Sequence, residues 1–290
     1  MKKLYFIILL IFLSVCVFGK DFTLGILDVG QGLCCVVISP DNHCLVYDCG
    51  TMNSKDLNKN KDVYKRILAP YLKDYNIKKI DCLVLSHPNL DHYSGFFDLM
   101  DNYKIEKYIK NGYKSESKTY NELMKLMAKK NLKTIVAKPN YYFYLGKDVK
   151  CTVLSPYSVF KPKDDNDLCV MMRVEYKKTS FLLTGDSSDT CEKYLAKVNK
   201  NIKSNVLIVS HHGSKYSSAN SFLNSVKPQI SIISCGKNNR YGHPHQAVLN
   251  RLKKIKSHIY RTDKDGSVIC RSDGKKISVY KKNYKSKFLF

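Results

Sequence analysis

Apolar residues along this 290-residue chain recur mainly in short runs of strand length, separated by turn residues. Three such runs near the beginning are divided by Gly-rich and Pro-Asp-Asn turns and predict an antiparallel meander, at 22–29, 33–38 and 43–47. A fourth run, 80–85, is bounded by turn residues and predicts a buried strand. The chain therefore begins its folded part with a sheet.

Stretches of helical spacing alternate with further strand-like runs. Helices are predicted at 63–75, with a kink at Pro70, and at 96–103, 117–130 and 246–252. Strands are predicted at 108–109, 132–137, 149–154, 206–210 and 230–234, with a hairpin at 168–176 and 179–184 and a small antiparallel ending at 257–260, 268–270 and 277–280. This order predicts one layered α/β domain with mixed sheets, spanning 20–290.

Three metal-ligand residues follow the run at 80–85 within six positions: His87, Asp91 and His92. Neutral imidazoles with a carboxylate suit a divalent metal that activates water for hydrolysis. For one isolated histidine, the better interpretation would be a polar loop in which the histidine only caps a helix or bonds the backbone. Three further strand-end motifs along the chain favour the metal.

Polar residues recur at the ends of other predicted strands. Asp48 closes the first meander and is either a partner that orients a ligand histidine or a turn former. Asp186 follows the hairpin, and the later loops carry His211, His212, His243 and His245. Six of the eight histidines fall in three strand-end loops, which is the distribution that one metal pocket at one rim requires.

The net charge of +24, from 49 basic and 25 acidic residues, favours a polyanionic partner such as nucleic acid or an anionic envelope polymer. Arginine provides only six of the basic side chains, so a general lysine bias explains the charge equally well. The Lys-rich tract at 104–150 predicts a solvated face, although tyrosines that could stack on bases interrupt it.

The first residues have the pattern of an export signal: Met1-Lys2-Lys3 is followed by an apolar run at 4–18. Cleavage after Gly19 is expected, which makes 1–19 a signal peptide, and lipidation at Cys16 or an uncleaved anchor are the alternatives. We expect an exported, monomeric protein that is secreted, periplasmic or anchored outside the cytoplasmic membrane. Most of the eleven cysteines lie in apolar runs and are predicted to be buried small residues, among them Cys34, Cys35, Cys44, Cys82, Cys151, Cys169, Cys235 and Cys270.

Six short motifs in order resemble the metallo-β-lactamase superfamily, and more narrowly the hydrolase domain of ComEC competence proteins. They are Asp-Val-Gly-Gln-Gly (28–32), Tyr-Asp-Cys-Gly (47–50), Ser-His-Pro-Asn-Leu-Asp-His (86–92), Leu-Thr-Gly-Asp (183–186), Ser-His-His-Gly-Ser-Lys (210–215) and Gly-His-Pro-His (242–245). The resemblance implies a four-layer αβ/βα sandwich of two mixed β-sheets with helices on the outer faces. It also implies a site for one or two metal ions at one rim.

Carried over by position, the resemblance implies these metal ligands: His87 and Asn89 for a first ion, Asp91 and His92 for a second, Asp186 as a bridge, and His211 as the last ligand. His212 is implied as an alternative ligand or a phosphate contact, and His243 and His245 as residues at the mouth. Asn89 stands where the family usually has His or Asp. The usual third-motif His is absent, and Asn166 lies in the region where ComEC-like domains carry Asn. Both departures make Mn²⁺ or a single Zn²⁺ as compatible as a Zn²⁺ pair.

The function expected from these residues is metal-dependent phosphodiester hydrolysis, with nucleic acid as substrate. Asp91 would hold or deprotonate the attacking water, and His243 or His245 would protonate the leaving oxygen. Ser214 and Lys215, with Ser217 and Ser218, would contact phosphate or, equally well, cap the helix from Ala219. The rival functions are hydrolysis of envelope phosphodiesters of the choline-phosphate type and a catalytically inactive module that binds polyanions.

Overall fold

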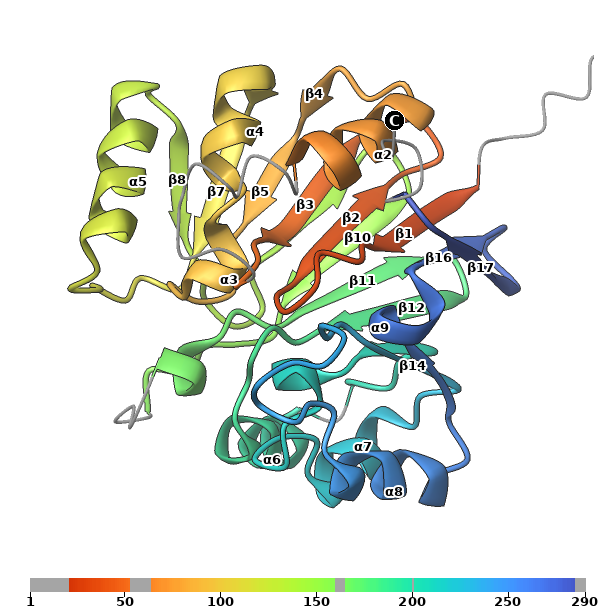
Figure 1. Ribbon diagram of the computed structural model, residues 1–290. Coiled ribbons are helices and arrows are strands. Elements are labelled where there is room, and N and C mark those ends of the chain that lie inside the picture. Colours follow the sequence, from red (N-terminus) through yellow and green to blue (C-terminus); the bar gives the residue numbers. More distant parts are fainter. Residues whose placement is uncertain (1–20, 53–63, 160–164, 200, 285–290) are drawn as a thin grey trace, which may run out of the picture.

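The computed structural model describes residues 21–52, 64–159, 165–199 and 201–284, and its centre is two stacked mixed β-sheets (Figure 1). The first sheet has eight strands in the order β17-β16-β1-β2-β3-β5-β7-β8. Its strands are β1 (Phe22–Ile26), β2 (Cys34–Ile38), β3 (Cys44–Cys49), β5 (Cys82–Val84), β7 (Lys107–Lys110), β8 (Lys133–Val136), β16 (Ser267–Ser272) and β17 (Ile277–Lys282). In this sheet the neighbours β3, β5, β7 and β8 pair in parallel, and the remaining pairs are antiparallel.

The second sheet has seven strands in the order β15-β14-β13-β12-β11-β10-β9. They are β9 (Tyr142–Leu145), β10 (Val149–Val153), β11 (Met172–Tyr176), β12 (Thr179–Leu183), β13 (Val206–Ile208), β14 (Ile230–Ile233) and β15 (His258–Arg261). Strands β12 to β15 are parallel, so their carboxyl ends lie at one edge. A separate short pair joins β4 (Lys79–Ile80) to β6 (Lys104–Ile105).

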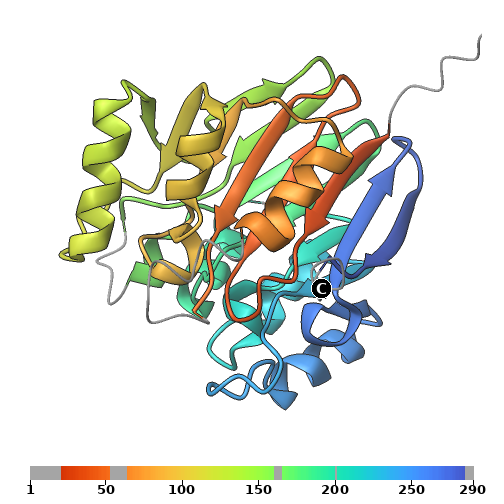
Figure 2. The same cartoon turned by 45° about the horizontal axis from the view of Figure 1, so that its top comes forward.

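Helices cover the outer face of each sheet (Figures 1 and 2). The first sheet packs against a π-helical turn (Tyr64–Leu68), α2 (Ala69–Asp74), α4 (Phe96–Asn102) and α5 (Lys118–Lys129). The second packs against α6 (Asp189–Val198), α7 (Asn220–Val226) and α8 (Gln246–Lys254). Shorter helical turns are α3 (Leu90–Tyr93), α9 (Thr262–Asp265) and two 3₁₀ turns (Asp165–Leu168 and Ser210–Gly213). The predicted four-layer sandwich is confirmed.

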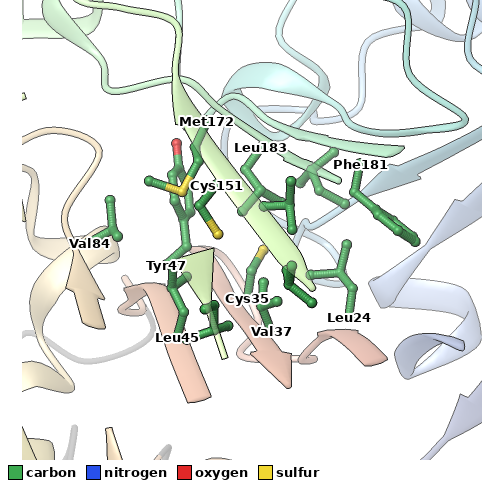
Figure 3. Packing of buried hydrophobic residues seen from close by; sticks show 14 of the residues in the cluster. Leu24, Cys35, Val37, Leu45, Tyr47, Val84, Cys151, Met172, Phe181 and Leu183 are labelled. Carbon is green, nitrogen blue, oxygen red and sulfur yellow. The ribbon is translucent and has the colours of Figure 1, made fainter. Parts of the chain in front are cut away.

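Apolar side chains from both sheets interdigitate in the central layer (Figure 3). The rings of Phe22 and Phe181 stack across it with centroids 4.6 Å apart. Strand β3 is buried on both faces: Leu45 and Tyr47 point to this layer, whereas Val46 points to the helices. Burial on both faces explains why such strands are continuous apolar runs rather than alternating ones.

Two sequence predictions were wrong about strands. The ending at 257–260, 268–270 and 277–280 is not one antiparallel unit, because β15 pairs in parallel with β14 in the second sheet while β16 and β17 extend the first. The edge strand β9 was missed, because its exposed positions are occupied by Tyr142 and Tyr144 and no polar alternation marks it.

The predicted kink near Pro70 falls where the π-helical turn gives way to α2, with the proline in the first turn of α2. The eight cysteines predicted to be buried are all buried, which confirms that prediction. Among the described residues, no helix combines the length and the apolar character needed to cross a bilayer. The predicted signal segment 1–19, with Cys16, lies outside the described residues.

Candidate metal centre

The ends of adjacent parallel strands bring the predicted ligand residues to one rim. Asp48 lies at the end of β3, and His87, Asp91 and His92 follow its parallel neighbour β5. In the second sheet Asp186 follows β12, and the His211-His212 pair follows β13. Because the carboxyl ends of parallel strands meet at one edge, residues as far apart along the chain as Asp91 and His212 become neighbours.

Four of these side chains converge on one point: Asp91, His92, Asp186 and His212 each offer a ligand atom within 4.8 Å of the others. Nε2 of His92 lies 3.2 Å from Oδ1 of Asp186. Nε2 of His212 lies 3.3 Å from Oδ2 of Asp91 and 3.5 Å from Oδ1 of Asp186. Two imidazoles and two carboxylates form a compact set of N and O donors.

The opposite ring nitrogens of the two histidines are held by neighbouring groups. Nδ1 of His92 lies 2.8 Å from Oδ2 of Asp48, and Nδ1 of His212 lies 2.9 Å from the carbonyl oxygen of Ser234. Both partners are acceptors, so Nδ1 carries the proton and Nε2 presents its lone pair to the cluster. The structure thus confirms that Asp48 orients a histidine.

Asp48 is itself fixed by the residue that precedes the first histidine. The backbone N–H of Ser86 donates to Oδ1 of Asp48 and the Ser86 hydroxyl donates to Oδ2, each at 2.7 Å. Burial raises the pKa of Asp48, although His92 and Ser86 oppose that rise. Sequence reasoning did not single out Ser86, whose only signal is its place between the strand and His87.

The buried polar atoms at the centre of the site fit a metal ion. Nε2 of His87, Nε2 of His92, Nε2 of His212 and Oδ1 of Asp186 are buried and make no hydrogen bond of good geometry. An unpaired buried polar atom is costly, and several in one site are unusual unless a ligand completes them. The donor set therefore fits a divalent cation, for which imidazole and carboxylate are ordinary ligands.

The histidines of the cluster lower the pKa values of its two carboxylates. Burial alone would raise the pKa of Asp186 and Asp91, but the neighbouring histidines outweigh it and both pKa values are lowered. His212 and His92 have the main effect on Asp186. The pKa of His87 is lowered to about 3, first by burial and then by His92, so His87 is neutral and keeps a free lone pair.

The loop that carries the histidine pair has an uncommon backbone. His211 and His212 both have φ of 53°, in the left-handed region that non-glycine residues rarely enter. The N–H of His211 donates to the carbonyl of Gly185 at 3.0 Å, which ties this loop to the loop of Asp186. The strain is consistent with a loop shaped to aim side chains.

The buried carboxylate of Glu192 braces the same loop from α6. It accepts hydrogen bonds from the Ser210 hydroxyl at 2.6 Å and from the N–H of Ala219 at 2.8 Å. Sequence reasoning missed Glu192, because nothing in the local pattern distinguishes it from an exposed helical glutamate. The alternative that serines cap α7 is wrong, since this helix has no side-chain cap.

The remaining predicted site residues lie around the four-residue cluster. Asn89 is the residue before α3 and is not among the four. His211, expected as the last ligand, has Nε2 3.7 Å from Oδ2 of Asp186, whereas His212, expected as its alternative, lies inside the cluster. The ring centroid of His243 is 6.2 Å from that of His212 and 5.0 Å from that of His245.

Residues at the mouth include the predicted substrate contacts. Lys215 has an exposed side chain, and its N–H donates to Nδ1 of His245 at 3.2 Å. Ser214 is buried and its hydroxyl accepts from the N–H of Tyr216. His245 is the residue before α8 but makes no side-chain cap.

The fold and the strand-end site define a class, and comparison with known proteins agrees with it. The model of the metallo-β-lactamase superfamily matches residues 27–237, and the chain belongs to that superfamily. The chain is 30% identical over 270 residues to ComE operon protein 3 of Bacillus subtilis, covering 90% of this chain and 34% of that protein. It is 31% identical over 242 residues to Recombination protein 2 of Haemophilus influenzae, covering 83% and 28%.

Competence protein ComA of Neisseria gonorrhoeae is likewise 31% identical over 242 residues, covering 83% of this chain and 31% of that protein. These relatives confirm the resemblance to ComEC-like domains. The chain spans about a third of the length of each. Among solved structures, the diiron β-hydroxylase CmlA from Streptomyces venezuelae has a TM-score of 0.56 at 10% identity, covering 87% of this chain and 54% of that one, which shows a shared fold alone.

Proposed function

We propose that this protein is a metal-dependent phosphodiesterase that hydrolyses DNA. The observation that carries the proposal is the cluster of Asp91, His92, Asp186 and His212. In this cluster Nε2 of His92, Nε2 of His212 and Oδ1 of Asp186 are buried without a hydrogen-bond partner. Membership of the metallo-β-lactamase superfamily supports a metal-dependent hydrolase fold. The choice of a phosphodiester rests on the surroundings of the cluster.

Those four residues would hold a Zn²⁺ or Mn²⁺ ion, and His87 with Asn89 would serve a second. A bound divalent ion supplies Lewis acidity, which favours ionisation of water and offsets negative charge on phosphate. Asp91 has the most exposed side chain of the four, at 14% against 5% or less. We therefore assign to Asp91 the task of orienting the attacking water.

His243 would bind the substrate rather than protonate it. Its pKa is lowered to about 4, first by burial and then by His212, His211 and His245, so it is neutral at pH 7. The amide nitrogen of Gln31 lies 3.5 Å from its Nδ1, and an N–H donated there leaves the ring proton on Nε2. A neutral His243 can donate that N–H to a phosphate oxygen, and the role of proton donor then falls to His245 or to solvent.

Exposed cations paired with tyrosines surround these histidines. Nζ of Lys215 lies 5.1 Å from the ring centre of Tyr216, and the Arg240 guanidinium lies 4.9 Å from that of Tyr241. Tyr216 is 67% exposed, and the ring of Tyr241 stacks on His243. Cations beside aromatic faces are the surface that unpaired nucleotides bind.

The charge and the relatives point to the same substrate class. A net charge of +24 favours a polyanion, and the names of the relatives refer to competence and recombination. Recombination is a process of DNA, so DNA is the polyanion we propose. Export of the protein through the segment 1–19, and its monomeric state, remain predictions from the sequence.

The deciding experiment measures metal content and cleavage on one preparation. Purified protein would be analysed for bound metals and assayed with Mn²⁺ or Zn²⁺ on single-stranded DNA, double-stranded DNA and bis(p-nitrophenyl) phosphate. We expect metal-dependent DNA cleavage that Asp186→Ala abolishes while DNA binding survives. Asp189→Ala, three residues further on in an exposed ion pair with Lys193, is the matched control and should keep activity.

Other outcomes would overturn the proposal in different ways. Cleavage of the small diester alone would indicate an envelope phosphodiesterase. Metal-free, inactive protein that still binds DNA would indicate a binding module. Activity that survives Asp186→Ala would exclude the cluster as the active site.

A further inference from the structure

Two cysteines stand opposite each other beside the metal centre. In the antiparallel pair of β2 and β3, Cys34 is the partner of Cys49, and Cys35 is the partner of Tyr47. The register shifts between these pairs, so Asp48 is an extra residue of a β-bulge, and its φ is 54°. A bulge of this kind re-aims a side chain, and here the side chain is the carboxylate that holds His92.

The bulge also places the two thiols on one face of the sheet. Cys34 and Cys49 both belong to the buried cluster under the helices, with Val36 and Val46. Cys35 instead points into the layer between the sheets, where Figure 3 shows it. The side chains of Cys34 and Cys49 interact directly with each other.

We propose that Cys34 and Cys49 form a disulfide when the protein folds in the presence of a disulfide oxidant. Directly opposed residues of an antiparallel pair have Cα atoms about 4.5 to 5.5 Å apart, within the range of roughly 4.4 to 6.8 Å that a disulfide spans. In the reaction, two thiols and one small-molecule disulfide give the protein S–S bond and two small-molecule thiols. The protein sulfurs are oxidised and the reagent is reduced.

The oxidation belongs to folding rather than to the folded protein. Both thiols are completely buried in the structure, and thiol–disulfide exchange needs an accessible thiolate. Once the helices cover this face, the reagent cannot reach either sulfur.

The bond would fix the segments that hold the ligand helix α3. The N–H of Leu33 donates to the carbonyl of Asp91 at 3.1 Å, and the N–H of Gly50 donates to the carbonyl of Leu33 at 3.0 Å. On the other side, the carbonyl of Cys49 accepts from the N–H of Gly95 at 2.7 Å. The cross-link therefore joins the two strands directly next to the Asp48 bulge and the Asp91 backbone.

The test is independent of the proposed enzyme activity. Reduced, denatured protein would be refolded with a mixture of oxidised and reduced glutathione, alkylated and digested, and its disulfides mapped by mass spectrometry. We expect one dominant cross-linked peptide pair containing Cys34 and Cys49, and a melting temperature about 5 °C above that of protein refolded with reductant alone.

The variants separate this bond from a general effect of oxidation. Cys34→Ala and Cys49→Ala should each abolish the difference in melting temperature between the two refolding conditions. Cys35→Ala is the matched control, because Cys35 is a buried cysteine at the adjacent position on the opposite face of the sheet. This variant should keep the difference in melting temperature. Both thiols remaining free in folded protein, or a dominant bond to any other cysteine, would overturn the proposal.

Discussion

Oδ2 of Asp48 lies 2.8 Å from Nδ1 of His92, and at the other end of the same two strands Oδ1 of Asp81 lies 2.8 Å from Nδ1 of His43. Strands β3 and β5 thus carry a carboxylate–histidine pair at each end. His92 faces the other ligand atoms of the cluster, whereas the side chain of His43 is partly exposed to solvent. The second pair is a natural control for the first.

Asp48→Asn should weaken metal binding about 10- to 100-fold, because the amide no longer sets the tautomer and basicity of His92. The measurement is a competition between the protein and a chromogenic chelator. Asp81→Asn breaks an equivalent pair away from the site and should leave metal affinity within about 2-fold. Equal losses in both variants would mean that Asp48 acts only through stability.

His212→Ala should cost more metal affinity than His211→Ala. Nε2 of His212 lies within 3.5 Å of two carboxylates, whereas Nε2 of His211 lies 3.7 Å from one. A lost ligand should exceed the roughly 10- to 100-fold cost of a lost outer partner, and His211→Ala should stay below about 10-fold. Metal titration of both variants decides this, and the reverse order would restore His211 as the last ligand.

Tyr216→Ala should weaken binding of single-stranded DNA by roughly 5- to 150-fold, which corresponds to about 1 to 3 kcal/mol for one stacked base. The measurement is fluorescence anisotropy with a labelled oligonucleotide at fixed salt. Tyr280→Ala is the control, since Tyr280 is 50% exposed and also lies beside a cation, Arg271, but on β17. Similar losses for both would show that DNA binding is spread over the surface.

Glu192→Gln should flatten the dependence of stability on pH. Burial raises the pKa of Glu192 from 4.5 to about 7, although Ser210 and the N–H groups of Ala219 and Ser218 oppose it. The folded protein therefore binds this proton more tightly than the unfolded chain, and stability falls as pH rises from about 4.5 to about 7.

At about 1.4 kcal/mol for each pKa unit, the effect on the free energy of unfolding is about 3 kcal/mol. Urea unfolding at several pH values would show a smaller change in Glu192→Gln than in the natural chain. Glu122→Gln, on the exposed face of α5, should keep the natural pH dependence. An unchanged slope in Glu192→Gln would show that this proton is not bound more tightly in the folded protein.

The sequence by itself determined the sheet class and most of the site. The run 80–85 followed by His87, Asp91 and His92 identified the rim, because a strand end fixes where the next few side chains lie. Recurrence at Asp186 and at the His211-His212 pair identified the second sheet's contribution for the same reason.

Only the tertiary structure decided which histidine of the pair enters the cluster and what holds it there. Adjacent residues on a loop point in directions set by φ and ψ, and the left-handed values at His211 and His212 depend on contacts with Gly185 and, through Ser210, with Glu192. The strand order likewise depended on long-range pairing: β15 joins β14, whereas β16, which follows it along the chain, pairs with β1 in the other sheet. Pairing partners and loop directions arise from contacts between distant segments, which a local pattern does not contain.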